Sequence, residues 1–214
     1  MENKIIYSSS KIIPTTYKEE HYLKNGYQNI AGVDEVGRGC IAGPLVAGAV
    51  IMNINAPEVW YSEVRDSKKI SIKKRERLAN LINQKAIVTG IGSIPHQDID
   101  RIGIVESTAR AMNSAVNQLC KVDFILVDAL PIKFDKPSES IIYGDSKIFS
   151  IACASIIAKV FRDELMNKLD ELYPGYNFKQ NKGYPTKKHL IALQNLGPSP
   201  IHRRSFGPVK AILN

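Results

Sequence analysis

The chain has 214 residues, of which 44% are hydrophobic and 23% charged, and this composition is typical of a globular domain rather than of a disordered or membrane-embedded chain. Lysine and arginine number 29 against 21 aspartate and glutamate, so the net charge is +8, which favours a polyanionic partner such as nucleic acid. The three cysteines are far apart, and no pair has zinc-site or thioredoxin-like spacing. Residues 1–28 do not resemble a signal peptide, so we expect a cytoplasmic protein without membrane association.

The pattern of apolar runs, caps and breakers predicts alternating strands and helices after a polar segment, 1–16, that we expect to pack poorly. The elements expected in chain order are a helical turn at 17–23, strands at 30–33 and 45–52, a helix at 72–84 capped by Ser71, a strand at 86–94, a helix at 104–119, strands at 124–127 and 141–143, and helices at 150–172 and 186–196. This order predicts one α/β domain, 17–214, with a mixed central sheet.

Acidic side chains follow three of the predicted strands: Asp34 with Glu35, Asp128, and Asp145. A buried carboxylate is costly unless it is paired or bound to a metal, although a lone aspartate at a strand end is as often a turn or cap residue. Because neighbouring strand ends converge at one edge of an α/β sheet, three such ends favour a common site. Carboxylates with little histidine and no cysteine suit Mg²⁺ or Mn²⁺ rather than zinc.

The adjacent pair Asp34 and Glu35 poses a geometric problem, because neighbouring residues of a regular strand point to opposite faces. Both side chains can reach one site only if the strand ends or bends there. Gly37 and Gly39 supply backbone freedom for a bend, and their backbone could also approach a ligand closely, with Arg38 able to meet a phosphate. By itself, however, a Gly-Arg-Gly triplet is more often a plain turn.

Residues 30–44, IAGVDEVGRGCIAGP, closely resemble the opening signature of the ribonuclease HII family. Further blocks resemble the family and follow in its order: 66–68 (DSK), 126–129 (LVDA), 144–147 (GDSK), 150–163 (SIACASIIAKVFRD), 182–186 (KGYPT) and 201–206 (IHRRSF). The blocks extend over nearly the whole chain, so the resemblance is far more specific than one short motif. It implies an RNase H-like fold, with a central mixed β-sheet flanked by helices and a small C-terminal helical region.

The resemblance also implies a catalytic centre that holds two divalent ions, Mg²⁺ or Mn²⁺. The residues expected to bind the metals and to be catalytic are Asp34, Glu35, Asp128 and Asp145. Asp163 is a rival for the fourth place, but it lies on a predicted helix beside Lys159, where a salt-bridged acid is the better interpretation.

The family cleaves RNA strands paired with DNA and incises DNA 5′ of single embedded ribonucleotides, so the resemblance implies these two partners and products with 5′-phosphate and 3′-hydroxyl ends. Gly37, Arg38 and Gly39 would contact the ribose 2′-hydroxyl, the group that distinguishes RNA from DNA. Tyr184 resembles the tyrosine that stacks on the sugar of the following deoxynucleotide, although as a bare residue it would be read as part of a turn. The remaining substrate contacts, expected at phosphates, are Lys68, Lys147, Lys182, His202 and Arg203. We expect a monomer.

The chain departs from the family pattern at Val36, usually alanine, at Ile148, where serine is expected, and at Cys153 in an alanine-rich run. It also stops at Asn214, without the longer C-terminal extension of some members. The Asp-Glu-Val-Gly string occurs in the sister family ribonuclease HIII too, although Arg38 argues against it. Three alternatives therefore stay open: a ribonuclease HIII-type nuclease that does not cut at single ribonucleotides, a non-catalytic nucleic-acid-binding module, and a Mg²⁺-dependent phosphatase acting on small molecules.

Overall fold

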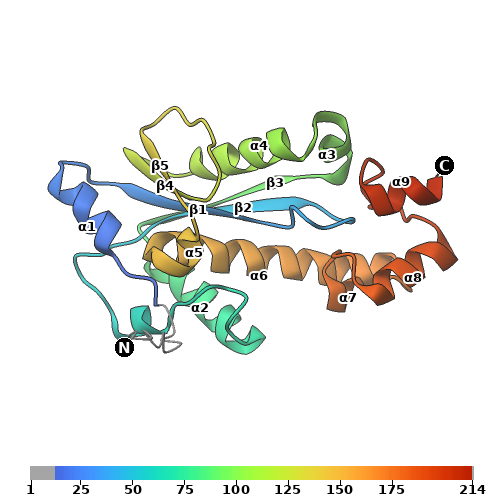
Figure 1. Ribbon diagram of the computed structural model, residues 1–214. Coiled ribbons are helices and arrows are strands. Elements are labelled where there is room, and N and C mark those ends of the chain that lie inside the picture. Colours follow the sequence, from blue (N-terminus) through green and yellow to red (C-terminus); the bar gives the residue numbers. More distant parts are fainter. Residues whose placement is uncertain (1–12, 214) are drawn as a thin grey trace, which may run out of the picture.

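A computed structural model describes residues 13–213 of the chain. Its centre is a five-stranded mixed sheet in the order β3-β2-β1-β4-β5 (Figure 1). The strands are β1 (Ile30–Val36), β2 (Leu45–Ile51), β3 (Val88–Ile94), β4 (Phe124–Asp128) and β5 (Ser138–Ile141). The first three strands form an antiparallel meander, whereas β4 and β5 run parallel to β1. The α/β class and the mixed sheet predicted from the sequence are thus confirmed.

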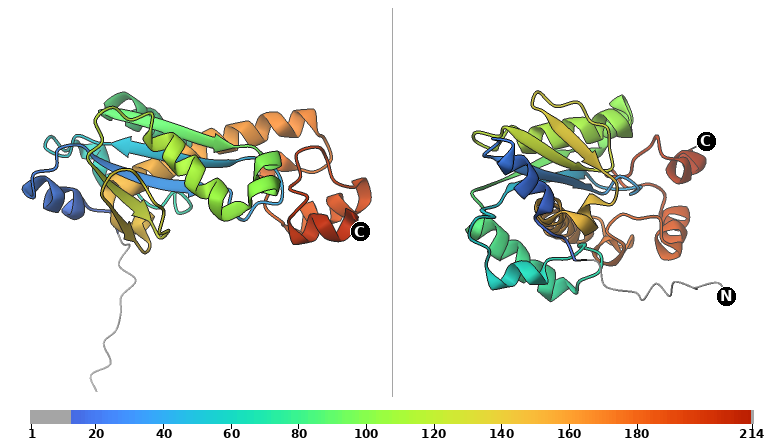
Figure 2. Two further views of the ribbon diagram at one scale, coloured as in Figure 1. Left: turned by 90° about the horizontal axis from the view of Figure 1, so that it is seen from above. Right: turned by 60° about the vertical axis from the view of Figure 1, so that its left-hand side comes forward.

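Helices cover both faces of the sheet. The helices of the described residues are α1 (Tyr17–Lys24), the 3-10 helix η1 (Val59–Glu63), α2 (Ile72–Lys85), α3 (His96–Ile102), α4 (Ile104–Val116), α5 (Gly144–Lys147), α6 (Phe149–Leu172), α7 (Phe178–Asn181), α8 (Lys187–Leu196) and α9 (Gly207–Leu213). In Figure 1, α3 and α4 lie on one side of the sheet and α2 and α6 on the other. The last three helices gather beyond the end of the sheet, beside the C-terminal part of α6 (Figure 2), and they form the predicted C-terminal helical region.

The long helix α6 lies against glycines of the two central strands. A Cβ atom added to Gly32 would lie 2.1 Å from the backbone carbonyl carbon of Ser150, and one added to Gly48 would lie 2.5 Å from the carbonyl oxygen of Ala154. Side chains at these two positions would push the helix away, so glycine sets this close packing. By strand alternation, the next residue of β1 on the α6 face is Asp34.

The pairing of β1 changes along its length. Toward β2 it is paired through Val36, with Asp34 opposite Gly48, but toward β4 its parallel pairing ends at Val33 opposite Val127. The last part of β1 therefore has a strand neighbour on one side only, and side chains there have space beside the end of β4.

Several sequence-based boundaries differ from the structure: β1 extends to Val36, β3 begins at Val88, the helix expected at 104–119 ends at Val116, and α3 was not expected. The last strand covers Ser138–Ile141 rather than 141–143, because Tyr143 adopts a left-handed conformation (φ 59°) that cannot continue a strand. Of segment 1–16, expected to pack poorly, only 13–16 are described; there the Thr15 N–H donates to the Lys147 carbonyl, and the Thr15 carbonyl accepts from the Phe149 N–H. Residues 1–12 lie outside the described residues. Within 13–213, no helix combines the length and apolar character that crossing a membrane requires.

Candidate active site

Three of the four predicted metal-binding acids come together. Asp34 lies on β1, Asp128 is the last residue of β4, and Asp145 is on α5. One carboxylate oxygen from each lies within 4.8 Å of the others, and we call this group the acid cluster. Asp34 and Asp145 are buried, and Asp128 is half-buried.

Strand alternation explains why Asp34 and Asp128 meet. Gly32, two residues before Asp34, faces α6, and Leu126, two residues before Asp128, packs in the apolar group that includes Ile151 of α6. Both aspartates therefore lie on the α6 face of adjacent parallel strands, where carboxyl ends converge.

Asp145 reaches the cluster from the short helix just before α6. Its neighbour Gly144 donates its N–H to Asp128 Oδ1 at 2.6 Å, which ties α5 to the end of β4. A Cβ atom at Gly144 would lie 3.1 Å from that same oxygen, so the approach needs a small residue. On its outer side Asp145 Oδ2 lies 3.5 Å from Lys68 Nζ.

The electrostatics of the cluster favour a cation. Burial raises the pKa of Asp34 well above its ordinary value, and the negative charges of Glu35 and Asp128 raise it further. Burial likewise raises the pKa of Asp128, and the Asp145 charge adds to the effect. Burial lowers the pKa of Lys68, but the Asp145 and Asp34 carboxylates outweigh this, so the net shift is upward. A donor set of carboxylate oxygens in this arrangement fits a hard divalent cation.

Glu35, the fourth predicted ligand, lies outside the cluster. β1 continues in register with β2 through Val36, so regular strand alternation would direct Glu35 away from Asp34, but the Glu35 charge still raises the pKa of Asp34. Its Oε1 lies 3.9 Å from Arg38 Nη1. Burial raises its pKa, Arg38 lowers it and Asp128 raises it, which places the Glu35 carboxylate at the border of the cluster.

Asp163, the rival acid, is paired with cations elsewhere. Its two carboxylate oxygens lie 2.7 Å from Lys159 Nζ and 3.5 Å from Arg75 Nη1. The salt-bridged arrangement expected for Asp163 is therefore present, and Asp163 is not part of the acid cluster.

The loop after β1 makes a turn that only its first glycine requires. Gly37 has φ +93°, and a Cβ there would lie 2.3 Å from Arg162 Nε, whereas a Cβ on Gly39 would meet nothing within 4 Å. The bend thus depends on Gly37, and Gly39 leaves an open, exposed approach to the backbone. Arg38 between them keeps 37% of its side chain exposed.

Two buried arginines, Arg162 and Arg203, support this loop from the interior of the protein. Arg162 and Arg203 are both 0% exposed, and neither has a carboxylate within salt-bridge distance among the described residues. Their donors bind backbone carbonyls instead. Arg162 donates to Ala42, Pro44 and Lys182, and Arg203 donates to Arg38 and Gly43. A buried charge is expensive, so these bonds fix the course of residues 37–44.

His202 and Arg203 do not lie where phosphate contacts require them. His202 is 1% exposed, and its ring nitrogens bind His189 and Ser199, while Arg203 is directed at the loop carbonyls. A side chain enclosed in this way cannot meet a phosphate of a bound duplex without local unfolding. The expectation that these two residues contact phosphate is therefore corrected, and both are internal supports.

The other predicted contacts border the cluster or the loop. The exposed Lys68 lies beside Asp145, and the exposed Lys147 donates to the Ile142 carbonyl. Lys182 is half-buried and donates to the Asp163 carbonyl, so Nζ is partly committed inside the protein. The half-buried Tyr184 ring has Lys159 Nζ 6.0 Å from its centroid.

Two residues were not identified from the sequence. Arg162 supports the loop through its carbonyls, and Lys159 lies over the Tyr184 ring. A signal existed for Arg162: it is seven residues after Ser155 and four before Met166, on the buried face of α6, where an arginine must have an internal role. The two departures at Ile148 and Cys153 are both 0% exposed, so they change core packing rather than a surface that nucleic acid could contact.

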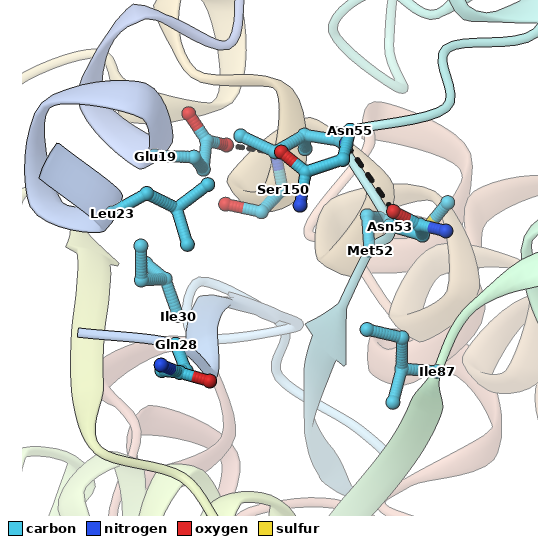
Figure 3. Close-up of a pocket in the computed structure, with 10 residues that line it drawn as sticks. Glu19, Leu23, Gln28, Ile30, Met52, Asn53, Asn55, Ile87 and Ser150 are labelled. Carbon is cyan, nitrogen blue, oxygen red and sulfur yellow. Dashed lines mark hydrogen bonds between the residues drawn. The ribbon is translucent and has the colours of Figure 1, made fainter. Parts of the chain in front are cut away.

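A separate pocket lies at the opposite end of β1 (Figure 3). It is a cavity of about 40 Å³ next to Ile30, Glu19 and Ser150, and none of the predicted site residues lines it. Its small volume and its distance along β1 from Asp34 separate it from the acid cluster.

Fold and site together define a class of α/β proteins in which carboxylates beside the central strand can bind hard divalent cations. The family model described as Ribonuclease HII matches residues 31–209. A relative named Ribonuclease HII from Listeria innocua serovar 6a is 49% identical over 203 residues, covering 94% of this chain and 77% of the relative.

Among solved structures, ribonuclease H2 from Pyrococcus horikoshii OT3 is similar with a TM-score of 0.72 and 26% identity, covering 86% of this chain and 97% of that one. Bst-RNase HIII in complex with Mn²⁺ has a TM-score of 0.68 at 18% identity, covering 87% and 70%, which is a likeness of fold. The chain belongs to the ribonuclease HII family, and it is thus a ribonuclease H enzyme, an endoribonuclease.

Proposed function

We propose that this enzyme hydrolyses the RNA strand of RNA–DNA hybrids and incises duplex DNA 5′ of single ribonucleotides, leaving 5′-phosphate and 3′-hydroxyl ends. The observation that carries the proposal is the acid cluster: three carboxylates from separate elements within 4.8 Å of one another, two of them buried. Such a cluster repels a phosphate backbone unless cations lie between them.

The proposed ligands are Asp34, Asp128 and Asp145, with Glu35 joining them by a side-chain rotation from the border of the cluster. Two divalent ions, when bound, would activate the attacking water and stabilise the leaving 3′ oxygen. Mg²⁺ and Mn²⁺ are the proposed ions, because the donors are all carboxylate oxygens, and the structural neighbour Bst-RNase HIII was crystallised with Mn²⁺.

The protein's own part is to place the substrate. The open backbone at Gly39 and the exposed Arg38 would meet the ribose 2′-hydroxyl and an adjacent phosphate, with Gly37 setting the turn. Tyr184 would stack on the sugar of the next deoxynucleotide. The proposed phosphate contacts that remain accessible are Lys68, Lys147 and, in part, Lys182.

A cleavage assay on an RNA–DNA hybrid tests the ligand assignment. With Mg²⁺ or Mn²⁺ we expect cleavage that EDTA abolishes, and a loss of more than about 100-fold in Asp34→Asn and Asp128→Asn with hybrid binding largely retained, since even residues behind metal ligands cost about 10- to 100-fold. Asp163→Asn is the matched control, because it removes an acid that lies outside the cluster. Near-normal cleavage in both cluster variants, or a dead Asp163→Asn, would refute the assignment.

Two alternatives predict different results. A ribonuclease HIII-type enzyme cuts the uniform hybrid but leaves a single embedded ribonucleotide intact. A non-catalytic nucleic-acid-binding module binds the hybrid but cleaves neither substrate with any divalent ion. The family match and the presence of the acid cluster support the ribonuclease HII-type activity over both.

A further inference from the structure

Two buried histidines form a continuous line of hydrogen bonds in the C-terminal region. The Ser199 N–H donates to His202 Nδ1 at 2.9 Å, His202 Nε2 lies 3.1 Å from His189 Nε2, and His189 Nδ1 lies 2.8 Å from the Tyr184 carbonyl oxygen. The line therefore starts at a backbone donor and ends at a backbone acceptor. We call it the histidine relay.

The two ends fix the position of each proton. A backbone N–H can only donate, so His202 Nδ1 must be the acceptor and its Nε2 must carry the hydrogen. His189 Nε2 then accepts that hydrogen, and its Nδ1 carries the proton that is donated to Tyr184. Each imidazole is neutral, and the two rings hold opposite tautomers. An added proton on either ring would bring two donors face to face.

The surroundings keep both rings neutral. His189 is 0% and His202 1% exposed, and both pack against Phe178, while His202 also contacts the Tyr176 ring. Burial lowers the pKa of both imidazoles, and the pKa of His202 falls to about 4. All four ring nitrogens have partners, as buried polar groups require.

The relay also lies between two parts of the proposed substrate surface. Ala42, on the loop that follows Gly39, pairs with His202 in an isolated antiparallel bridge. The Ile41 N–H donates to the Gly183 carbonyl at 2.9 Å, directly beside Tyr184. The loop and the Tyr184 segment are therefore joined both directly and through the two histidines.

Hydrogen bonds to the Tyr184 carbonyl fix the position of this residue. It accepts two donors at 2.8 Å, His189 Nδ1 and the Thr186 N–H. Pro185 follows and restricts Tyr184 to extended conformations. With the peptide plane held in this way, the ring keeps only its side-chain torsions, and its direction depends on the orientation of that plane.

We propose that His189 and His202 are positioning residues, which hold Tyr184 in register with the Gly37–Gly39 loop through the histidine relay. This role rests on the proposed function of Tyr184 as the residue that stacks on the nucleotide after the ribonucleotide. It predicts that the relay governs the preference for RNA–DNA junctions over uniform hybrids, in addition to its part in core packing.

The first test concerns the tautomers of His189 and His202. It is made on the folded protein and does not depend on an activity measurement. The chain has four histidines, so the double variant His21→Gln/His96→Gln leaves only the relay imidazoles visible. Two-bond ¹H–¹⁵N correlation spectra at pH 7 are expected to show His202 protonated at Nε2 and His189 protonated at Nδ1, the less common form in peptides. Identical tautomers in the two rings, or a protonated ring at pH 7, would overturn the relay.

The positioning role is tested by kinetics in the full-length enzyme. His189→Phe keeps the ring packing but removes the donor to Tyr184, and we expect kcat/KM on a single-ribonucleotide duplex to fall by about 10- to 100-fold relative to a uniform hybrid. His189→Asn, whose amide nitrogen can take the place of Nδ1, should recover part of this ratio. Tyr176→Phe is the matched control, because it removes the bond from the Tyr176 hydroxyl to the Gly197 carbonyl in the same aromatic group.

A double-mutant cycle separates positioning from simple packing. In a Tyr184→Ala background, His189→Phe should change the substrate ratio no further, because its effect passes through the missing ring. An unchanged ratio in His189→Phe, or a penalty that persists without Tyr184, contradicts the proposal. If His189→Phe does not fold, the substrate ratio of His189→Asn and the tautomer spectra decide whether the proposal holds. If the wild-type enzyme cleaves neither substrate, the proposed function fails, whereas the tautomer result still stands.

Discussion

Replacing Gly37 with alanine should damage the protein far more than the same change two residues later at Gly39. Gly37 has φ +93°, a conformation that L-residues rarely adopt, and a Cβ there would lie 2.3 Å from Arg162 Nε. At Gly39 a Cβ would meet nothing within 4 Å, and the backbone is not left-handed. The two substitutions add the same methyl group on either side of Arg38, so each is the control for the other.

The magnitude for Gly37→Ala has two parts. The positive φ costs an alanine about 1–2 kcal/mol. The clash displaces the Arg162 guanidinium, which donates to three carbonyls, and losing one charged hydrogen bond costs about 1.5–3 kcal/mol. We therefore expect Gly37→Ala to lower the free energy of unfolding by about 2.5–5 kcal/mol, or Tm by about 5–20 °C. Gly39→Ala should stay within about 0.5 kcal/mol of wild type.

Urea denaturation followed by circular dichroism measures both variants, with the cleavage assay alongside. Gly39→Ala is expected to fold normally but to lose discrimination for the ribonucleotide, because its methyl group would occupy the space proposed for the 2′-hydroxyl. Equal stability losses in the two variants would refute the loop geometry. A fully active Gly39→Ala enzyme would refute the proposed ribose contact while leaving the loop geometry intact.

Three further predictions concern buried titratable groups. Asp34→Asn should raise the Tm of the metal-free protein in EDTA while abolishing cleavage, because burial and neighbouring acids oppose the Asp34 charge; a lower Tm would contradict this. The pKa of His202 is lowered to about 4, against an ordinary value of 6.5. The stability that neutral His202 contributes is therefore complete above pH 6.5, and up to about 3 kcal/mol of it is lost as the pH falls toward 4. Urea unfolding at pH 7 and 4.5 checks this, with Tyr176→Phe as the control. The raised pKa of Glu19 gives the opposite pH dependence. The protein loses stability as the pH rises above the ordinary pKa of a glutamate, so Glu19→Gln should stabilise the protein at pH 7 but not at pH 4. A pH-independent difference would show that the Glu19 charge is not the cause.

The sequence allowed the mixed sheet and the main helices to be predicted, because strand alternation and helix periodicity are local properties. It could not resolve whether Glu35 shares a site with Asp34. That depends on where β1 stops pairing with its neighbours, and the strand continues along β2 through Val36. The position of β5 was wrong by a few residues, since Tyr143 takes a left-handed conformation that no pattern of apolar residues reveals.

The misassigned residues show a second limit. His202 and Arg203 are polar and basic within a block that resembles the family, so phosphate contact was the natural interpretation from sequence. Whether such residues face solvent or the interior is decided by tertiary packing, here by the docking of the C-terminal region against residues 37–44. Buried polar residues that bind backbone carbonyls are hard to distinguish from ligand-binding ones in a single sequence.

The most direct test of the account is incision of a DNA duplex that contains one ribonucleotide. With Mg²⁺ or Mn²⁺, the wild-type enzyme is predicted to cut immediately 5′ of that ribonucleotide, and EDTA or Asp128→Asn is predicted to prevent the cut. An intact duplex, with the uniform hybrid still cleaved, would contradict the single-ribonucleotide activity. Cleavage that persists in EDTA, or in Asp128→Asn, would contradict the assignment of the acid cluster as the metal-binding catalytic centre.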